Sequence, residues 1–92
     1  MASATARLRV RQLKDLLERS FPQAEISDLG RPTRESRVGG VIVWDGFAGK
    51  TQLERQRVLW DALRDSLRAD ELLDVGLILT LTPRESQALG AD

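Results

Sequence analysis

Residues 38–56 read VGGVIVWDGFAGKTQLERQ, and this stretch decides the fold. Val41, Ile42 and Val43 are consecutive β-branched residues, which is typical of a strand that lies centrally in a sheet. We therefore predict a strand over Val38–Trp44. The two glycines near its start weaken a strand, and they indicate a bulge or the close approach of another backbone segment.

A long helix is predicted directly after this strand. The dipeptide Asp45–Gly46 turns the chain, and Thr51 and Glu54 have the spacing of a capping box, in which two side chains cap the start of a helix. Apolar residues then recur at helical spacing, so the helix is predicted to run to Arg68. The pattern also allows a break near Arg55.

The flanking segments complete the fold prediction. Val10, Leu13 and Leu17 recur at helical spacing among charged residues, so an amphipathic helix is predicted from about Thr5 to Ser20. Further predictions are an edge-like strand over Ala24–Leu29, a loop over Gly30–Arg37, a polar connection over Ala69–Asp74, a strand over Val75–Thr82 and a short helix over Pro83–Leu89. These elements predict an α+β domain of two layers, in which helices cover one face of a mixed sheet.

The composition limits the possible function classes. The 92 residues suffice for a single domain, with a core over about residues 6–89. The chain contains no histidine and no cysteine. Zinc, Fe–S and blue-copper centres are built on those side chains, and so are the usual nucleophile–base pairs. We therefore expect no cofactor, no metal site, no catalytic residues and no enzymatic activity.

Charge and hydropathy further limit the expected binding partners and cellular location of the protein. The 14 Lys and Arg residues balance the 14 Asp and Glu residues, so no global attraction to nucleic acid is expected. No apolar run is long enough for a secretory signal or a membrane span. We expect a cytoplasmic protein that does not bind membranes. A monomer and a weak homodimer through the edge of the sheet both remain open.

Two segments together resemble the BolA family. The first is VIVWDGFAGK at residues 41–50, followed by RQRV at residues 55–58. It resembles the family's apolar strand, its Phe-x-Gly turn, and the Arg-His-Arg sequence that opens the long helix. The second is TLTPRE at residues 80–85, which resembles the family's closing strand and Thr-x-Thr-Pro-x-Glu turn. The first helix, ending in Phe21 and Pro22, is also similar to that of the family.

The resemblance implies a three-stranded α-β-β-α-α-β fold, similar to the type II KH fold, and a small partner protein. BolA-like proteins associate with monothiol glutaredoxins and share a 2Fe–2S cluster with them. The family histidine that precedes the Thr-x-Thr-Pro motif falls at Asp74 here, and the histidine of the Arg-His-Arg sequence falls at Gln56. The second cluster ligand of the family would fall within Gly30–Arg37, which has neither Cys nor His.

These departures shape the functional prediction. A carboxylate is a poor substitute for imidazole on an Fe–S iron. We therefore expect a BolA-like binding or regulatory module, with a link to stress, that partners a monothiol glutaredoxin or another protein without ligating its cluster. Phe47 is expected to anchor its turn in the core, and Gly46 and Gly49 are expected to permit that turn.

The alternative function is binding of DNA or RNA in the manner of a KH domain. Residues 46–49 match the Gly-x-x-Gly form that KH domains use to clamp a nucleic-acid backbone. Several arginines, Arg31 among them, could also form one basic face. Arg55 and Arg57 could equally pair with Glu54, Asp61 or Asp45 on an ordinary helix surface. The candidate residues for binding a partner or nucleic acid are Arg34, Arg37, Lys50, Arg55, Arg57 and Asp74.

Overall fold

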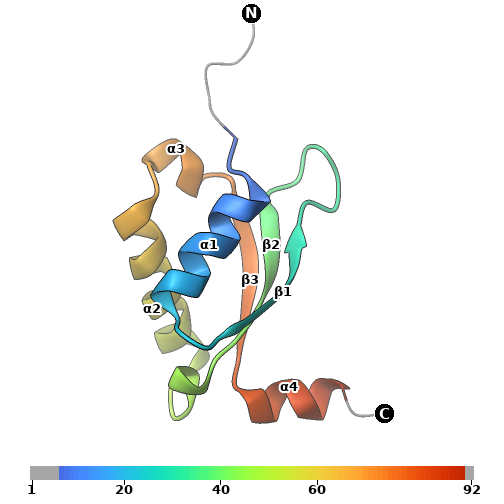
Figure 1. Ribbon diagram of the computed structural model, residues 1–92, viewed down its shortest axis with the longest axis vertical. Helices are drawn as coiled ribbons and strands as arrows, with labels where there is room; N and C mark the ends of the chain where they lie inside the picture. The colour runs from blue at the N-terminus through green and yellow to red at the C-terminus, as the bar shows by residue number, and fades with distance from the viewer. Residues whose placement is uncertain (1–6, 91–92) are drawn as a thin grey trace, which may run out of the picture.

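A three-stranded sheet forms one layer of the molecule, and helices pack against one of its faces (Figure 1). The computed structural model describes residues 7–90. The elements are α1 (Val10–Ser20), β1 (Glu25–Gly30), β2 (Val38–Val43), the short 3-10 helix η1 (Asp45–Phe47), α2 (Gln52–Ser66), α3 (Ala69–Leu72), β3 (Val75–Leu81) and α4 (Pro83–Gly90). β2 pairs antiparallel with β1 and parallel with β3, so it lies at the centre. The predicted α+β class and mixed sheet are confirmed.

Two details of the predicted helices are wrong. The first helix begins at Val10, because Leu8 is buried in an extended segment instead of continuing the helical stripe; Thr5 lies outside the described residues. The break near Arg55 does not occur, since α2 is continuous from Gln52 to Ser66. Arg55 interrupts the apolar stripe in sequence but still turns inward, with 5% of its surface exposed.

A further helix lies within the segment predicted as a polar connection. α3 spans Ala69–Leu72, and the Glu71 carboxylate accepts a hydrogen bond from the Arg68 backbone N–H at 2.9 Å. Four residues are too few to reveal a helical period in a sequence. By contrast, the capping box that opens α2 is present, with Thr51 and Glu54 each accepting from the other's backbone N–H.

The core lies between the two long helices and the sheet. Its fully buried side chains come from α1 (Leu13, Leu17), β2 (Val38, Ile42), α2 (Leu59, Leu63) and β3 (Ile78). An aromatic cluster closes one end, where the Trp44 ring lies edge-on to Phe21 and Phe47 at centroid distances of 5.0 and 5.2 Å. The Trp44 indole N–H donates to the Pro22 carbonyl at 3.0 Å, so this cluster fastens the turn after β2 to the end of α1. None of the helices in residues 7–90 is long and apolar enough to cross a membrane.

The two glycines at the start of β2 are required by close packing on both sides. A Cβ on Gly39 would lie 2.6 Å from the Leu77 carbonyl oxygen, and a Cβ on Gly40 would lie 2.7 Å from Leu29 Cδ2. The register between β2 and β3 also shifts between Val38 and Gly40. Of the two predicted alternatives, the close backbone approach therefore occurs here, next to a shift in register of the kind that a bulge produces.

Gly39 offers a direct test of this packing. We expect Gly39→Ala to lower the free energy of unfolding by about 2 kcal/mol, because the new methyl group must displace the backbone of β3. Gly30→Ala is the matched control, since nothing lies within 4 Å of a Cβ at that position. Urea denaturation of both variants measures the difference, and equal stabilities would contradict the close approach of β2 and β3 at Gly39.

Candidate functional site

Asp74 and Arg31 form an ion pair that joins the start of β3 to the loop after β1. The contact is bidentate, with Arg31 Nη1 2.7 Å from Asp74 Oδ1 and Nη2 2.5 Å from Oδ2. Arg31 also donates to the carbonyls of Leu8 at 2.7 Å and Ser36 at 2.8 Å. The Leu8 backbone N–H donates to Asp74 at 2.9 Å. We call this network of Leu8, Arg31, Ser36 and Asp74 the clasp.

The clasp holds its charges in a largely buried setting. The exposed fractions of the Arg31 and Asp74 side chains are 16% and 17%. The hydrogen bonds from Arg31, supported by the Leu8 N–H and by the nearby positive charge, lower the pKa of Asp74 to about 2. The same hydrogen bonds raise the pKa of Arg31. Asp74 is therefore ionised near neutral pH, and both of its oxygens already accept hydrogen bonds.

Arg55 forms a second bidentate ion pair at the other end of β3. Its guanidinium contacts the two Glu85 carboxylate oxygens at 2.6 and 3.0 Å. It also donates to the carbonyls of Lys50 and Thr80 at 3.0 and 3.1 Å. Glu85 in turn accepts from the Thr82 backbone N–H at 2.9 Å and so caps the start of α4. The pair with Arg55 lowers the pKa of Glu85 to about 2.

This second pair corrects the expectations for Arg55. Because its guanidinium is buried, Arg55 does not contribute to an exposed basic face. Its partner is also none of Glu54, Asp61 and Asp45. The spacing of Thr82 and Glu85 is that of a capping box, a signal from which a carboxylate at the start of α4 could have been predicted.

Gln56 occupies the outer edge of β3, the side of the strand that faces away from β2. Its amide donates to the Ile78 carbonyl at 3.0 Å and to the Thr80 hydroxyl at 3.3 Å. Gln52 donates to the Thr80 carbonyl at 3.2 Å. Side chains of α2 thus satisfy the edge of this strand from Ile78 onward, which protects it from pairing with another strand.

The other candidate binding residues do not come together on one face. Arg34 and Arg37 are exposed in the loop before β2, and Arg7 donates to the Arg34 carbonyl at 2.5 Å. Lys50 lies beyond the opposite end of β2, between η1 and α2, and the exposed Arg57 follows in α2. A strand of this length separates its ends by roughly 20 Å. The structure therefore places these cations in two separate groups.

The Gly-x-x-Gly segment forms the turn between β2 and α2. Phe47 is fully buried and Gly49 has φ of +80°, a conformation that favours glycine. Gly46 is crowded by the Trp44 ring, which leaves no room for a Cβ. In KH domains the corresponding loop joins two helices, whereas here it follows a strand. The contacts of Phe47 and the two glycines are those of a packed turn.

The carboxylates near α3 are engaged by other side chains, and Arg68 contacts both of them. Asp70 contacts Arg68 at 3.2 Å, and Glu71 accepts from Gln12 at 3.0 Å. Within residues 7–90, no three acidic side chains gather where they could hold a metal ion.

Solved structures of BolA proteins share this arrangement of helices and strands. A BolA homologue from Coxiella burnetii superposes with a TM-score of 0.68 at 21% identity, over 87% of this chain and 97% of its own. The chain has a BolA-like fold. The BolA domain of SufE1 from Arabidopsis thaliana gives a TM-score of 0.59 at 25% identity, over 92% of this chain and 99% of its own. BolA1 from the same plant gives 0.57 at 23% identity, over 85% and 95%.

The likeness appears in structure more clearly than in sequence. No protein-family model matches the chain, and no curated protein matches it. The resemblance read from residues 41–58 and 80–85 is nonetheless confirmed by the BolA-like fold.

The clasp predicts a specific dependence of stability on pH. The pKa of Asp74 is about 2 in the folded state against an ordinary value of 3.8, so its stabilising effect is complete above about pH 4 and is lost toward about pH 2. The shift corresponds to about 2 kcal/mol. We expect Asp74→Asn to remove this part of the acid dependence, measured by urea denaturation from pH 7 to pH 2. Asp61→Asn is the control because its ion pair with Arg64 is exposed. Identical pH profiles for wild type and Asp74→Asn would refute the clasp.

The same substitution is expected to have a large effect on stability at Arg55 and a small effect at Arg57. Arg55→Met removes a donor from the Lys50 and Thr80 carbonyls and leaves Glu85 without its cation, so we expect it to lower the free energy of unfolding by about 3 kcal/mol. Arg57→Met removes an exposed charge two residues away and should change stability by less than about 0.5 kcal/mol. Thermal and urea denaturation measure both changes. A tolerated Arg55→Met would show that the guanidinium is not held as described.

Proposed function

We propose that this BolA-like chain is a non-enzymatic protein-binding module that does not ligate an Fe–S cluster. The clasp is the observation that carries the proposal. The resemblance locates the two cluster-ligand positions at Asp74 and within Gly30–Arg37. In this chain the Asp74 carboxylate binds the guanidinium of Arg31, and the segment Gly30–Arg37 contains neither Cys nor His. Neither group matches the thiolate and imidazole ligands of Fe–S iron, so the residues do not fit the cluster.

The chemistry of the remaining side chains supports a binding role. With no histidine or cysteine, the Ser and Thr hydroxyls lack the usual base that would activate them. Asp74 and Glu85 have pKa values of about 2, which makes both carboxylates weak bases near neutral pH. Both are also engaged by arginines, so their arrangement serves the fold.

A monothiol glutaredoxin is the partner that the BolA resemblance favours, and binding would depend on shape and charge without a shared metal. A regulatory role in the cytoplasm, with a link to stress, rests on the same resemblance and stays a prediction. The nucleic-acid alternative has less support, because Arg55 is buried and the exposed candidate cations form two separate groups.

Mixing the chain with a cluster-loaded monothiol glutaredoxin tests both parts of the proposal. We expect a complex by size-exclusion chromatography and no new band in visible circular dichroism. The gain-of-ligand variant Arg31→Cys with Asp74→His places a thiolate and an imidazole at the clasp, and it should produce a new band if it remains folded by far-ultraviolet circular dichroism.

The outcomes separate the two claims. A new visible band from the wild-type chain would refute the absence of ligation. If no complex forms, the proposal of a glutaredoxin partner is refuted. The claim that the chain does not ligate a cluster is then decided by whether the double variant gains a visible band that the wild-type chain lacks.

A further inference from the structure

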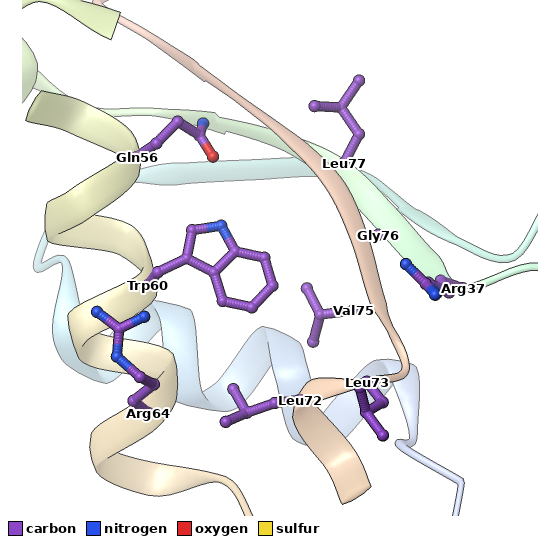
Figure 2. A pocket seen from close by; sticks show the side chains of 9 residues that line it. All are labelled: Arg37, Gln56, Trp60, Arg64, Leu72, Leu73, Val75, Gly76 and Leu77. Carbon is purple, nitrogen blue, oxygen red and sulfur yellow. The ribbon is translucent and has the colours of Figure 1, made fainter. Parts of the chain in front are cut away.

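An open groove of about 570 Å³ lies between α2, α3 and the outer edge of β3 (Figure 2). The half-buried Trp60 ring occupies its middle, with Leu72 and Val75 close to it. None of these residues takes part in the clasp or in the Arg55–Glu85 pair. The groove is therefore a surface feature distinct from the two ion-paired sites.

The groove has apolar borders that folding leaves in water. The exposed fractions of Leu73 and Leu77 are 72% and 71%, and both line it. The half-exposed Trp60 lies in the groove, and Leu77 lies at its rim, where its side chain points to the opposite side of β3 from Trp60 (Figure 2). Large apolar side chains exposed along a groove are of the kind that mark an interaction site. Burying these side chains against a partner would gain the free energy of their transfer from water.

The exposed edge of β3 opens into the same groove. The α2 amides satisfy the strand edge at Ile78 and Thr80. Among the described residues, no side chain of α2 or α3 donates to the backbone of Val75, which lines the groove, whereas the Leu77 carbonyl lies against Gly39 of β2. An extended segment could therefore lie beside this part of the strand and use its backbone groups, as in strand addition to a sheet edge.

The charges around the groove have one sign. Its charged lining residues are Arg37 and Arg64, and no carboxylate lines it. Arg64 contacts Asp61 at 2.5 Å, but both side chains are more than half exposed, so the pair is weak and easily exchanged. Within residues 7–90 Arg37 forms no ion pair. A ligand with carboxylates is therefore complementary to this surface.

We propose that this groove binds an extended segment of a partner protein that carries aliphatic side chains and at least one carboxylate. The aliphatic side chains contact Trp60, Leu73 and Leu77, and the carboxylate pairs with Arg37 or Arg64. This deepens the proposed function, on which it rests, by naming a surface and a kind of partner. The probes below contain neither glutaredoxin nor cluster, so each proposal can fail alone.

Two other occupants fit the groove less well. Single-stranded nucleic acid needs a basic track and stacking surfaces for successive bases, whereas the groove offers two arginines and one aromatic ring. A second copy of the chain would meet the same patch in a two-fold dimer. Such a dimer would bring the arginines of one copy toward those of the other, which is unfavourable.

The proposal is tested by phage display. A library of random twelve-residue peptides is selected for binding to the full chain. We expect the enriched peptides to combine aliphatic and acidic residues. The affinity of one fluorescein-labelled peptide is then measured by fluorescence anisotropy. We expect the double variant Leu73→Ser, Leu77→Ser to bind this peptide roughly tenfold more weakly than the wild-type chain does. Leu89→Ser is the matched control because Leu89 is equally exposed and lies on α4, away from the groove. Arg64→Glu should weaken binding, and Arg11→Glu on α1 should not.

The two tryptophans provide an internal readout. The Trp44 indole N–H is bound to the Pro22 carbonyl, whereas Trp60 lies in the groove. We expect the peptide to shift the Trp60 indole resonance and to leave that of Trp44 unchanged. The proposal is overturned if no peptide is enriched, or if enriched peptides bind the Leu73 and Leu77 variant normally. It is also overturned if only a single-stranded oligonucleotide shifts Trp60, or if sedimentation shows a dimer that the same variant abolishes.

Discussion

The bidentate pair between Arg31 and Asp74 is the constraint that holds one end of the molecule together. It ties the segment before α1, the loop after β1 and the start of β3 into one network. A buried ion pair gains little over a well-packed apolar alternative, but removing one partner leaves an uncompensated charge. Arg31 and Asp74 are therefore expected to change together or not at all, and a lone substitution at either position is disfavoured.

The same physical solution appears at the opposite end of β3. Glu85 follows this strand and pairs with Arg55, as Asp74 precedes it and pairs with Arg31. β3 is an edge strand, held on one side only by its parallel pairing with β2. The two pairs secure its ends, and the amides of Gln52 and Gln56 satisfy the outer edge between them. Within residues 7–90, the part of β3 before Ile78 receives no hydrogen bond from these amides, and it lies at the groove.

The sequence predicts local features of this fold well and misses the contacts between distant residues. The capping box at Thr51 and the crowded glycines in β2 follow from residue type and spacing within a few positions. The partners of the two ion pairs are 43 residues apart in sequence for Arg31 and Asp74 and 30 residues apart for Arg55 and Glu85. No pattern within a few positions predicts such pairs. Arg55 looked like a surface cation because arginine is mostly exposed, and only the fold supplies the carboxylate and carbonyls that allow its burial.

The clasp has a consequence for where this chain can make contact with partners. It is formed by the side chains of Arg31 and Asp74 and by the backbone of Leu8 and Ser36. Here the same positions satisfy one another, so their charges cancel and their donors and acceptors are used internally. Two of the most exposed leucines, Leu73 and Leu77, line the groove that holds Trp60. Recognition by this BolA-like chain is thus expected to rely on burial of apolar surface and complementary charge, with the clasp keeping β3 in position for it.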